Sequence, residues 1–106
     1  EDPAHHFRPC PGVIEEIHLP GGNGVRIDTA AYNGYEIPPF YDSMIAKVIV
    51  HGRTRQEAID KMRSTLGELI IDGVTTNVDF QYEILDNEDC QAGEITTDFI
   101  PMHFNL

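Results

Sequence analysis

Basic residues are scarce in this chain of 106 residues, which has seven Lys and Arg against eighteen Asp and Glu and a formal net charge of −11. Because nucleic acids and anionic membranes bind basic surfaces, this balance argues against either of them as the main partner. The sequence also lacks any apolar run near the roughly 20 residues that span a bilayer, and no signal segment opens it. What remains is an ordinary globular composition, with 41% hydrophobic residues and scattered acids.

Cysteine is limited to Cys10 and Cys90, which lie far apart in the sequence. A single disulfide between them is one alternative, but two separate thiols in a cytoplasmic protein are the interpretation that we favour. His5 and His6 lie close to Cys10, yet no second pair of ligands follows at metal-binding spacing, so we predict no metal site.

The length of the chain suits one domain with a single core and is too short for most complete enzymes with a nucleotide site. The chain begins at Glu1 without an initiator Met. We therefore expect it to be a piece of a longer polypeptide.

The first half of the sequence alternates apolar and polar residues with a period of two, which predicts β-strands over residues 13–19 and 25–28. Residues 20–24 are rich in glycine, and we expect them to form a hairpin turn. Residues 44–50 are apolar apart from Lys47, which is typical of a central strand buried on both faces. Lys47 must then either reach the edge of the sheet or pair with a carboxylate.

The second half changes to a helical period. Thr54 and Glu57 form a capping box, and a helix is predicted over residues 54–69 from the apolar residues at helical spacing, Ala58, Ile59, Met62, Leu66 and Leu69. We expect a turn at residues 70–74, a second helix from its cap at Asn77 to about residue 86, and one more short turn or strand in the tail. The fold class is therefore α+β, with a small antiparallel β-sheet followed by two helices.

Two familiar kinds of site are excluded by the sequence. The glycines at residues 21–24 are not a phosphate loop, because no Lys-Ser/Thr pair follows and the next segment is a strand rather than a helix. Asp42, Ser43 and His51 share no recognisable nucleophile elbow, so no catalytic triad can be argued.

Arg26 is the residue best suited to bind an anion. It projects from the face of its strand opposite the core, beside the glycine-rich turn. Its guanidinium is always charged and offers a planar fork of donors to carboxylate, bicarbonate or phosphate. On spacing alone, the alternative is a solvated arginine paired with Asp28 or Glu16. Asp72 has an ordinary alternative role too, as a turn or capping residue.

Four motifs occur in order and at matching separations: EDP (1–3), RPCPGVIEEIHLPGGNGVRID (8–28), PPFYDSMIAKVIVHG (38–52) and ELIIDGVTTNVDF (68–80). Together they resemble the C-terminal domain of the biotin carboxylases over about residues 1–86. The run LIIDGVTTN is most similar to the biotin carboxylase subunit of bacterial acetyl-CoA carboxylase, which serves fatty acid biosynthesis. Pyruvate and propionyl-CoA carboxylases are similar over the other motifs. We take residues 1–106 as one such domain.

This resemblance implies a ligase whose N-terminal and ATP-grasp portions lie outside the chain. Such an enzyme uses ATP and Mg²⁺ to activate bicarbonate, and then carboxylates biotin held on a biotin carboxyl carrier protein. The resemblance further implies a homodimer. By itself the chain would bind none of these cofactors and would be inactive. A non-catalytic scaffold or binding domain of the same fold is the alternative.

Roles for Arg26 and Asp72 also follow from the resemblance. Arg26, in the GVR motif, would reach the active site and stabilise the anion that develops on the ureido oxygen of biotin. Asp72, in the IIDG motif, would lie near the biotin ring. The resemblance implies the dimer alone, but Arg53 and Arg55 are two of only seven bases on an acidic chain, so we expect them to pair with acids across its interface. Solvent-facing arginines at the start of a helix are the alternative.

Overall fold

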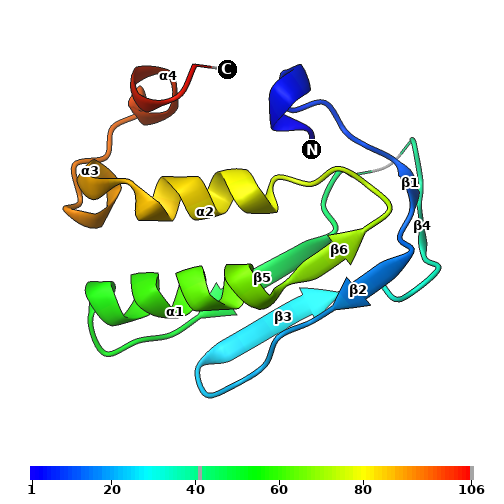
Figure 1. Ribbon diagram of the computed structural model, residues 1–106, viewed down its shortest axis with the longest axis horizontal. Coiled ribbons are helices and arrows are strands. Elements are labelled where there is room, and N and C mark those ends of the chain that lie inside the picture. Colours follow the sequence, from blue (N-terminus) through cyan, green and yellow to red (C-terminus); the bar gives the residue numbers. More distant parts are fainter. Residues whose placement is uncertain (41, 106) are drawn as a thin grey trace.

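The computed structural model describes residues 1–40 and 42–105 of the chain. Figure 1 shows its elements in order along the chain. The strands are β1 (Gly12–Val13), β2 (Glu16–His18), β3 (Val25–Thr29), β4 (Glu36–Ile37), β5 (Ala46–Val50) and β6 (Ile70–Asp72). The helices are the 3₁₀ turn η1 (Pro3–His5), α1 (Arg55–Glu68), α2 (Val78–Asp86), α3 (Glu88–Gln91) and α4 (Phe99–His103).

The strands pair antiparallel in three ladders of two, β1 with β4, β2 with β6, and β3 with β5. Helix α1 lies over β5, and α2 runs beside α1 (Figure 1). With dimensions of 38 × 34 × 19 Å, the domain is about two layers of secondary structure thick. The α+β class is confirmed, and its antiparallel sheet takes the form of three short ladders.

The segment predicted as one strand over residues 13–19 is interrupted where the chain changes partner. The Ile14 N–H donates to the Tyr35 carbonyl at 2.9 Å, whereas the Glu15 N–H donates to the Asp72 carbonyl at 2.8 Å. Ile14 becomes fully buried at this point. The expectation of one continuous strand was wrong, because pairing first with β4 and then with β6 breaks the period of two.

The glycine-rich residues 20–24 do not connect a hairpin. The strand before them, β2, pairs with β6, and the strand after them, β3, pairs with β5. Residues 70–74, predicted as a turn, begin with strand β6 instead. Both predictions failed for the same reason, because the partner of each strand lies far along the chain and leaves no signal in the local sequence.

Strand β5 begins at Ala46 and is not buried on both faces. Lys47 is exposed and Ile49 is 38% exposed, whereas the residues between and beside them are half-buried. Among the described residues, the strand is hydrogen-bonded to β3 alone and packs against α1. The prediction of a doubly buried central strand was wrong because a two-stranded ladder covered by one helix keeps its other face exposed.

Helix α1 confirms the predicted long helix and its cap. Thr54 Oγ1 accepts the Glu57 N–H at 3.1 Å, which satisfies one of the free donors of the first turn. On the predicted apolar stripe, Ile59, Leu66 and Leu69 are between 5% and 8% exposed. Burying a side chain of this size contributes about 1.5–3 kcal/mol, so the stripe holds α1 against the rest of the core.

Helix α2 confirms the second predicted helix, but the side chain of Asn77 does not cap it. Asn77 Oδ1 accepts a hydrogen bond from Gln81 Nε2 at 3.0 Å, and the Val78 N–H donates to Thr76 Oγ1 at 3.4 Å. The φ of −97° and ψ of 16° at Asn77 lie outside the extended region from which a capping side chain reaches the first turn.

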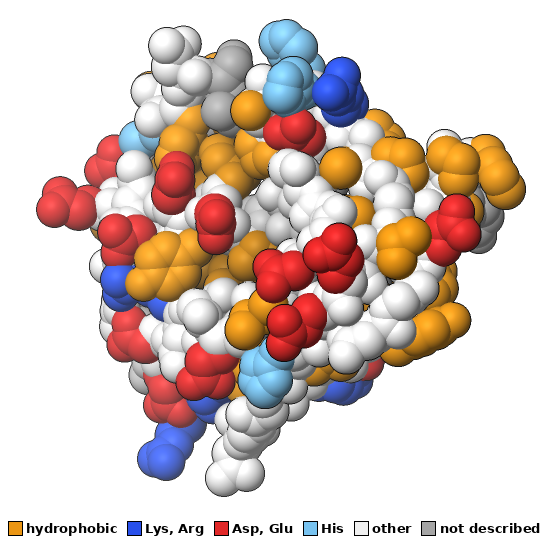
Figure 2. Space-filling view, turned by 45° about the vertical axis from the view of Figure 1, so that its right-hand side comes forward, with side chains coloured by type: hydrophobic (Ala, Val, Ile, Leu, Met, Phe, Trp, Pro, Cys, Tyr) orange, Lys and Arg blue, Asp and Glu red, His pale blue; other side chains and the backbone are white. Residues whose placement is uncertain are grey.

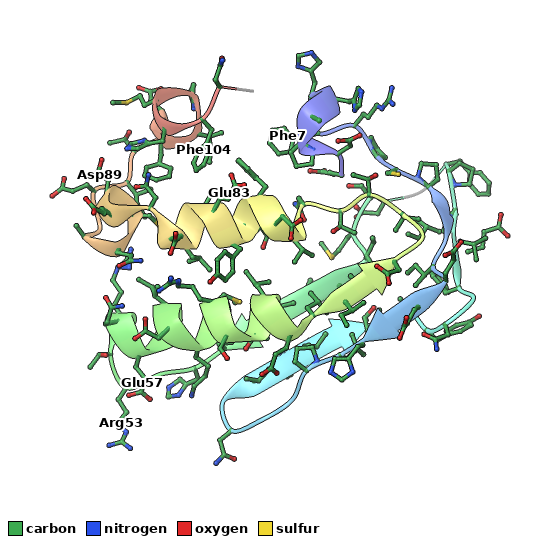
Figure 3. All side chains as sticks on the ribbon, in the orientation of Figure 1. Phe7, Arg53, Glu57, Glu83, Asp89 and Phe104 are labelled. Atoms are coloured by element: carbon green, nitrogen blue, oxygen red, sulfur yellow. The ribbon has the colours of Figure 1, made fainter. Side chains whose placement is uncertain are left out.

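The tail after α2 forms two short helices, α3 and α4, where a turn or strand was expected. Cys90 and Phe99 are each 5% exposed, so the tail supplies part of the core. Both ends of the chain meet on α2, where Phe80 packs edge-on against Phe7 and Phe104 with ring centroids 5.2 and 5.1 Å apart. Figure 3 shows Phe7 and Phe104 on the same side of α2, above the helix in this view.

Candidate functional site

Arg26 lies on the exposed face of the ladder formed by β3 and β5. In the antiparallel register, Arg26 is opposite Ile49 and Asp28 is opposite Lys47. Directly opposed residues point to the same side of a ladder, and all four of these are exposed. Arg26 therefore projects away from the core, as the sequence pattern predicts. Lys47 lies on this exposed face rather than inside the domain.

The Arg26 guanidinium contacts the carboxylate of Asp28, with Nη2 3.1 Å from Oδ2. Asp28 was one of the two partners left open by the sequence, and the other, Glu16, lies in β2 opposite Asp72. The Arg26 and Asp28 side chains are 70% and 50% exposed. Exposed ion pairs typically contribute less than about 1 kcal/mol, so an incoming anion can compete with Asp28 for the guanidinium.

A hollow of about 260 Å³ lies beside Arg26 at the end of the ladder, lined also by Ile49 and His51. Gly24 comes directly before β3 at this end of the ladder and has a φ of +73°. Its carbonyl accepts the His51 N–H at 2.8 Å, and a Cβ on Gly24 would lie 2.7 Å from the His51 carbonyl oxygen. The two chain segments approach this closely because residue 24 has no side chain.

Asp72 is the last residue of β6 and is exposed. Its carbonyl is held by the Glu15 N–H, and its side chain is presented at the turn that follows. Gly73 makes this turn with φ of +104°, and a Cβ there would lie 2.3 Å from the Val13 carbonyl oxygen. The turn that presents Asp72 therefore requires glycine at residue 73.

Arg26 and Asp72 line different hollows of this domain. Asp72 borders a hollow of about 380 Å³ between β6 and the start of α2, whereas Arg26 borders the hollow at the end of β3 and β5. The structure thus places one exposed guanidinium, which can stabilise an anion, and one separate carboxylate, which can accept hydrogen bonds. Further protein or a ligand that spans both hollows is needed to combine the two groups.

Arg53 and Arg55 have different environments although they are two residues apart. Arg55 Nη2 donates to the Cys90 carbonyl at 2.6 Å, so this side chain ties the start of α1 to α3 within the domain. Arg53 is exposed, and Figure 3 shows it pointing away from the domain below the start of α1. Of the two, Arg53 is the one whose charge is directed toward solvent.

His5 and Cys10 make separate contacts with different parts of the chain. His5 Nδ1 lies 2.7 Å from Asp2 Oδ2, and this hydrogen bond lowers the pKa of the Asp2 carboxyl. Cys10 Sγ accepts the Thr75 N–H at 3.4 Å, and both cysteines are free thiols. Within residues 1–40 and 42–105, no group of three or more His, Cys, Asp or Glu is arranged to hold a metal ion.

The surface is acidic in character. Figure 2 shows Asp and Glu scattered across the face that it draws, with Lys and Arg toward the margin. In the part of the chain that the structure describes, no helix combines the length and hydropathy needed to cross a membrane.

Sequence reasoning passed over two polar contacts that the structure brings out. Lys61 donates to the His51 carbonyl at 2.7 Å, and His103 Nε2 lies 2.8 Å from Asp89 Oδ2. The sequence offered one signal for the Lys61 contact, because Lys61 is adjacent to Met62 of the apolar stripe and a lysine beside such a stripe lays its aliphatic stem against the core. The pair in the tail had no such signal, because it depends on how α3 and α4 fold together.

Comparison with known proteins places the chain in a family. Residues 1–102 match the model of the biotin carboxylase C-terminal domain. Biotin carboxylase 1 of Bacillus subtilis is 50% identical over 94% of this chain and 22% of its own length. A pyruvate carboxylase subunit of Methanothermobacter thermautotrophicus is 51% identical over 94% of this chain and 20% of its own length.

A solved structure agrees. The biotin carboxylase domain dimer of Hydrogenobacter thermophilus 2-oxoglutarate carboxylase, in complex with MgADP, ADP and bicarbonate, matches with a TM-score of 0.95 and 42% identity, over 97% of this chain and 23% of that one. The chain belongs to the biotin carboxylase C-terminal domain family. It spans about one fifth of the length of the relatives that it matches.

Proposed function

We propose that this domain works as part of a biotin carboxylase and supplies Arg26 to an active site shared with an ATP-grasp portion. The observation that carries the proposal is the placement of Arg26, whose backbone lies in the β3–β5 ladder and whose exposed side chain is only weakly paired. In this scheme ATP, Mg²⁺ and bicarbonate are bound outside the domain.

The proposed role of Arg26 is electrostatic. Carboxylation of a ureido nitrogen of biotin passes through an enolate-like anion on the ureido oxygen. A guanidinium fixed beside that oxygen donates hydrogen bonds as the charge develops, which is worth roughly 3 kcal/mol for one preorganised donor. Asp72 is proposed to accept a hydrogen bond near the biotin ring, from its own place at the β6 turn.

The proposed partners are a second copy of the enzyme and a biotin carboxyl carrier protein. The biotin carboxylase domain in the Hydrogenobacter structure is a dimer, which supports the first of these. A cytoplasmic location is proposed as well, and the two free thiols are consistent with a reducing compartment.

The enzyme system that we propose is acetyl-CoA carboxylase, on the similarity of the LIIDGVTTN run (69–77). A pyruvate carboxylase is the second candidate, favoured by the 51% identity with the Methanothermobacter protein. ADP release by the full-length enzyme, measured with purified biotinylated carrier from each system, distinguishes the two. A clear preference for the pyruvate carboxylase carrier would overturn the first assignment.

Replacing Arg26 tests the proposed function. In the full-length enzyme, Arg26→Ala should lower biotin carboxylation by about two or more orders of magnitude, because one preorganised charged donor is lost. Arg26→Lys should restore little, since an ammonium lacks the planar fork. The KM for ATP should change little in both variants. Near-normal carboxylation by Arg26→Ala would show that Arg26 is only a surface residue.

A further inference from the structure

Lys61 of α1 reaches the end of the ladder that carries Arg26. Its Nζ donates to the His51 carbonyl oxygen at 2.7 Å. The same ammonium occupies the space beside Gly24, because a Cβ on that residue would lie 2.6 Å from Nζ. The half-buried side chain of Lys61 therefore lies against both strands of the ladder at its closed end.

His51 is held on both of its backbone groups at this point. Its N–H donates to the Gly24 carbonyl at 2.8 Å, and its carbonyl accepts from Lys61. The next pair inward is Val25 with Val50, followed by Arg26 with Ile49. Lys61 thus connects a rigid helix to the ladder two residues from Arg26.

The orientation of Arg26 depends on this backbone rather than on its side-chain contacts. Its guanidinium pairs with Asp28 on the exposed face, and such a pair is too weak to fix the side chain against solvent. A catalytic group must nevertheless be held within about 0.5 Å of its productive place. The position of Arg26 must therefore be set by the backbone of the ladder, whose end is held by Lys61.

We propose that Lys61 is a positioning residue for Arg26, and this inference rests on the proposed function. Lys61 holds the His51 carbonyl, and the His51 N–H is bonded in turn to the Gly24 carbonyl at the end of the ladder. These two hydrogen bonds fix the end of strand β3, from which Arg26 projects. Misplacement by about 1 Å costs up to about a hundredfold in rate, so loss of the ammonium should act on the chemical step through Arg26.

The test uses the full-length enzyme with biotin as substrate. Lys61→Met, which keeps the stem and removes the ammonium, should lower kcat about ten- to a hundredfold and leave the KM for ATP unchanged. Lys61→Arg should recover most of the activity because it keeps a charged donor. The matched control is Arg63→Met, on the same helix, which removes the contacts with Asp86 and Tyr82 but touches nothing near Arg26. This control should lower the melting temperature and keep kcat.

A double-mutant cycle separates the inference from the proposed function. In the Arg26→Ala background, Lys61→Met should cause no further loss of kcat, because its effect passes through Arg26. An equal loss in both backgrounds, or no loss in the wild-type background, would overturn the inference. An Arg26→Ala variant with normal activity would instead overturn the proposed function. If Lys61→Met does not fold, Lys61→Gln compared with Arg63→Met at matched melting temperature decides the question.

Discussion

At the scale of single residues, Gly24 and Gly73 hold the turns next to Arg26 and Asp72. Both have positive φ, and at both a Cβ would meet a backbone carbonyl oxygen at less than van der Waals distance. A backbone obstruction cannot rotate away as a side chain can, so the requirement for glycine is strict. The backbone positions of Arg26 and Asp72 therefore depend on a nearby glycine in each case.

Gly73→Ala should lower the free energy of unfolding of the domain by more than about 2 kcal/mol, through both the positive φ and the contact with Val13. Gly34→Ala is the matched control, because Gly34 also has positive φ but open space around it, so it should cost less. Gly67→Ala, inside α1, should stabilise the domain by about 0.5–1 kcal/mol. Urea denaturation measures all three, and equal losses for Gly73→Ala and Gly34→Ala would contradict the steric argument.

At the scale of elements, the tail is held by a histidine with two acceptors. His103 Nε2 lies 2.8 Å from Asp89 Oδ2 and Nδ1 lies 2.9 Å from the Phe99 carbonyl oxygen, while the ring stacks on Phe99. A carboxylate and a carbonyl only accept, so both hydrogen bonds form only when both ring nitrogens carry protons. The hydrogen bond to Asp89, followed by that to Phe99, raises the pKa of His103 above its ordinary 6.5. Figure 3 shows Asp89 on α3 below α4.

The docking of α4 should therefore weaken as pH rises. Because the folded-state pKa is the higher one, the stabilisation is complete below about pH 6.5 and is lost as pH rises through the folded pKa. Amide hydrogen exchange in α4, corrected for intrinsic rates, should show less protection at pH 9 than at pH 6. His103→Gln is the control and should remove this dependence. A dependence that persists in His103→Gln would assign it to another histidine.

At the scale of the whole molecule, the domain exposes groups that suit contact with further protein. Phe40 is 88% exposed and Met44 is 57% exposed. Arg53 points outward at the start of α1, whereas Arg55 is engaged with the Cys90 carbonyl. If the proposed dimer uses this end of α1, Arg53 rather than Arg55 is the cation available to it.

Arg53→Glu in the full-length enzyme should weaken the dimer by about fivefold at low salt and less at moderate salt, because a rim ion pair is worth about 1 kcal/mol and is screened. Sedimentation at the two salt concentrations measures the change. Arg55→Ala is the comparison, and it should loosen α3 with little effect of salt on the dimer. A dimer constant unaltered by Arg53→Glu at both salts would remove Arg53 from the interface.

The sequence by itself determined the elements whose signals are local. The cap at Thr54, the stripe through Ile59 and Leu66, and strand β3 follow from interactions within a few residues, and all of them are present in the structure. The projection of Arg26 from the core followed from the same alternation. The four motifs identified the family for a different reason, since residue types at fixed separations are a property of the sequence alone.

Only the tertiary structure decided which segments pair and what supports the site. Glu16 lies opposite Asp72 in the β2–β6 ladder, and the Arg55 side chain donates a hydrogen bond to the Cys90 carbonyl. In both cases the two residues are far apart in the sequence. The hydrogen bonds from the His51 N–H to the Gly24 carbonyl and from Lys61 to the His51 carbonyl likewise join a loop, a strand end and a helix. Periodicity reports the direction in which a side chain faces and not the segment that it meets. That choice depends on how the whole chain buries its apolar surface, so it is made only when the domain folds.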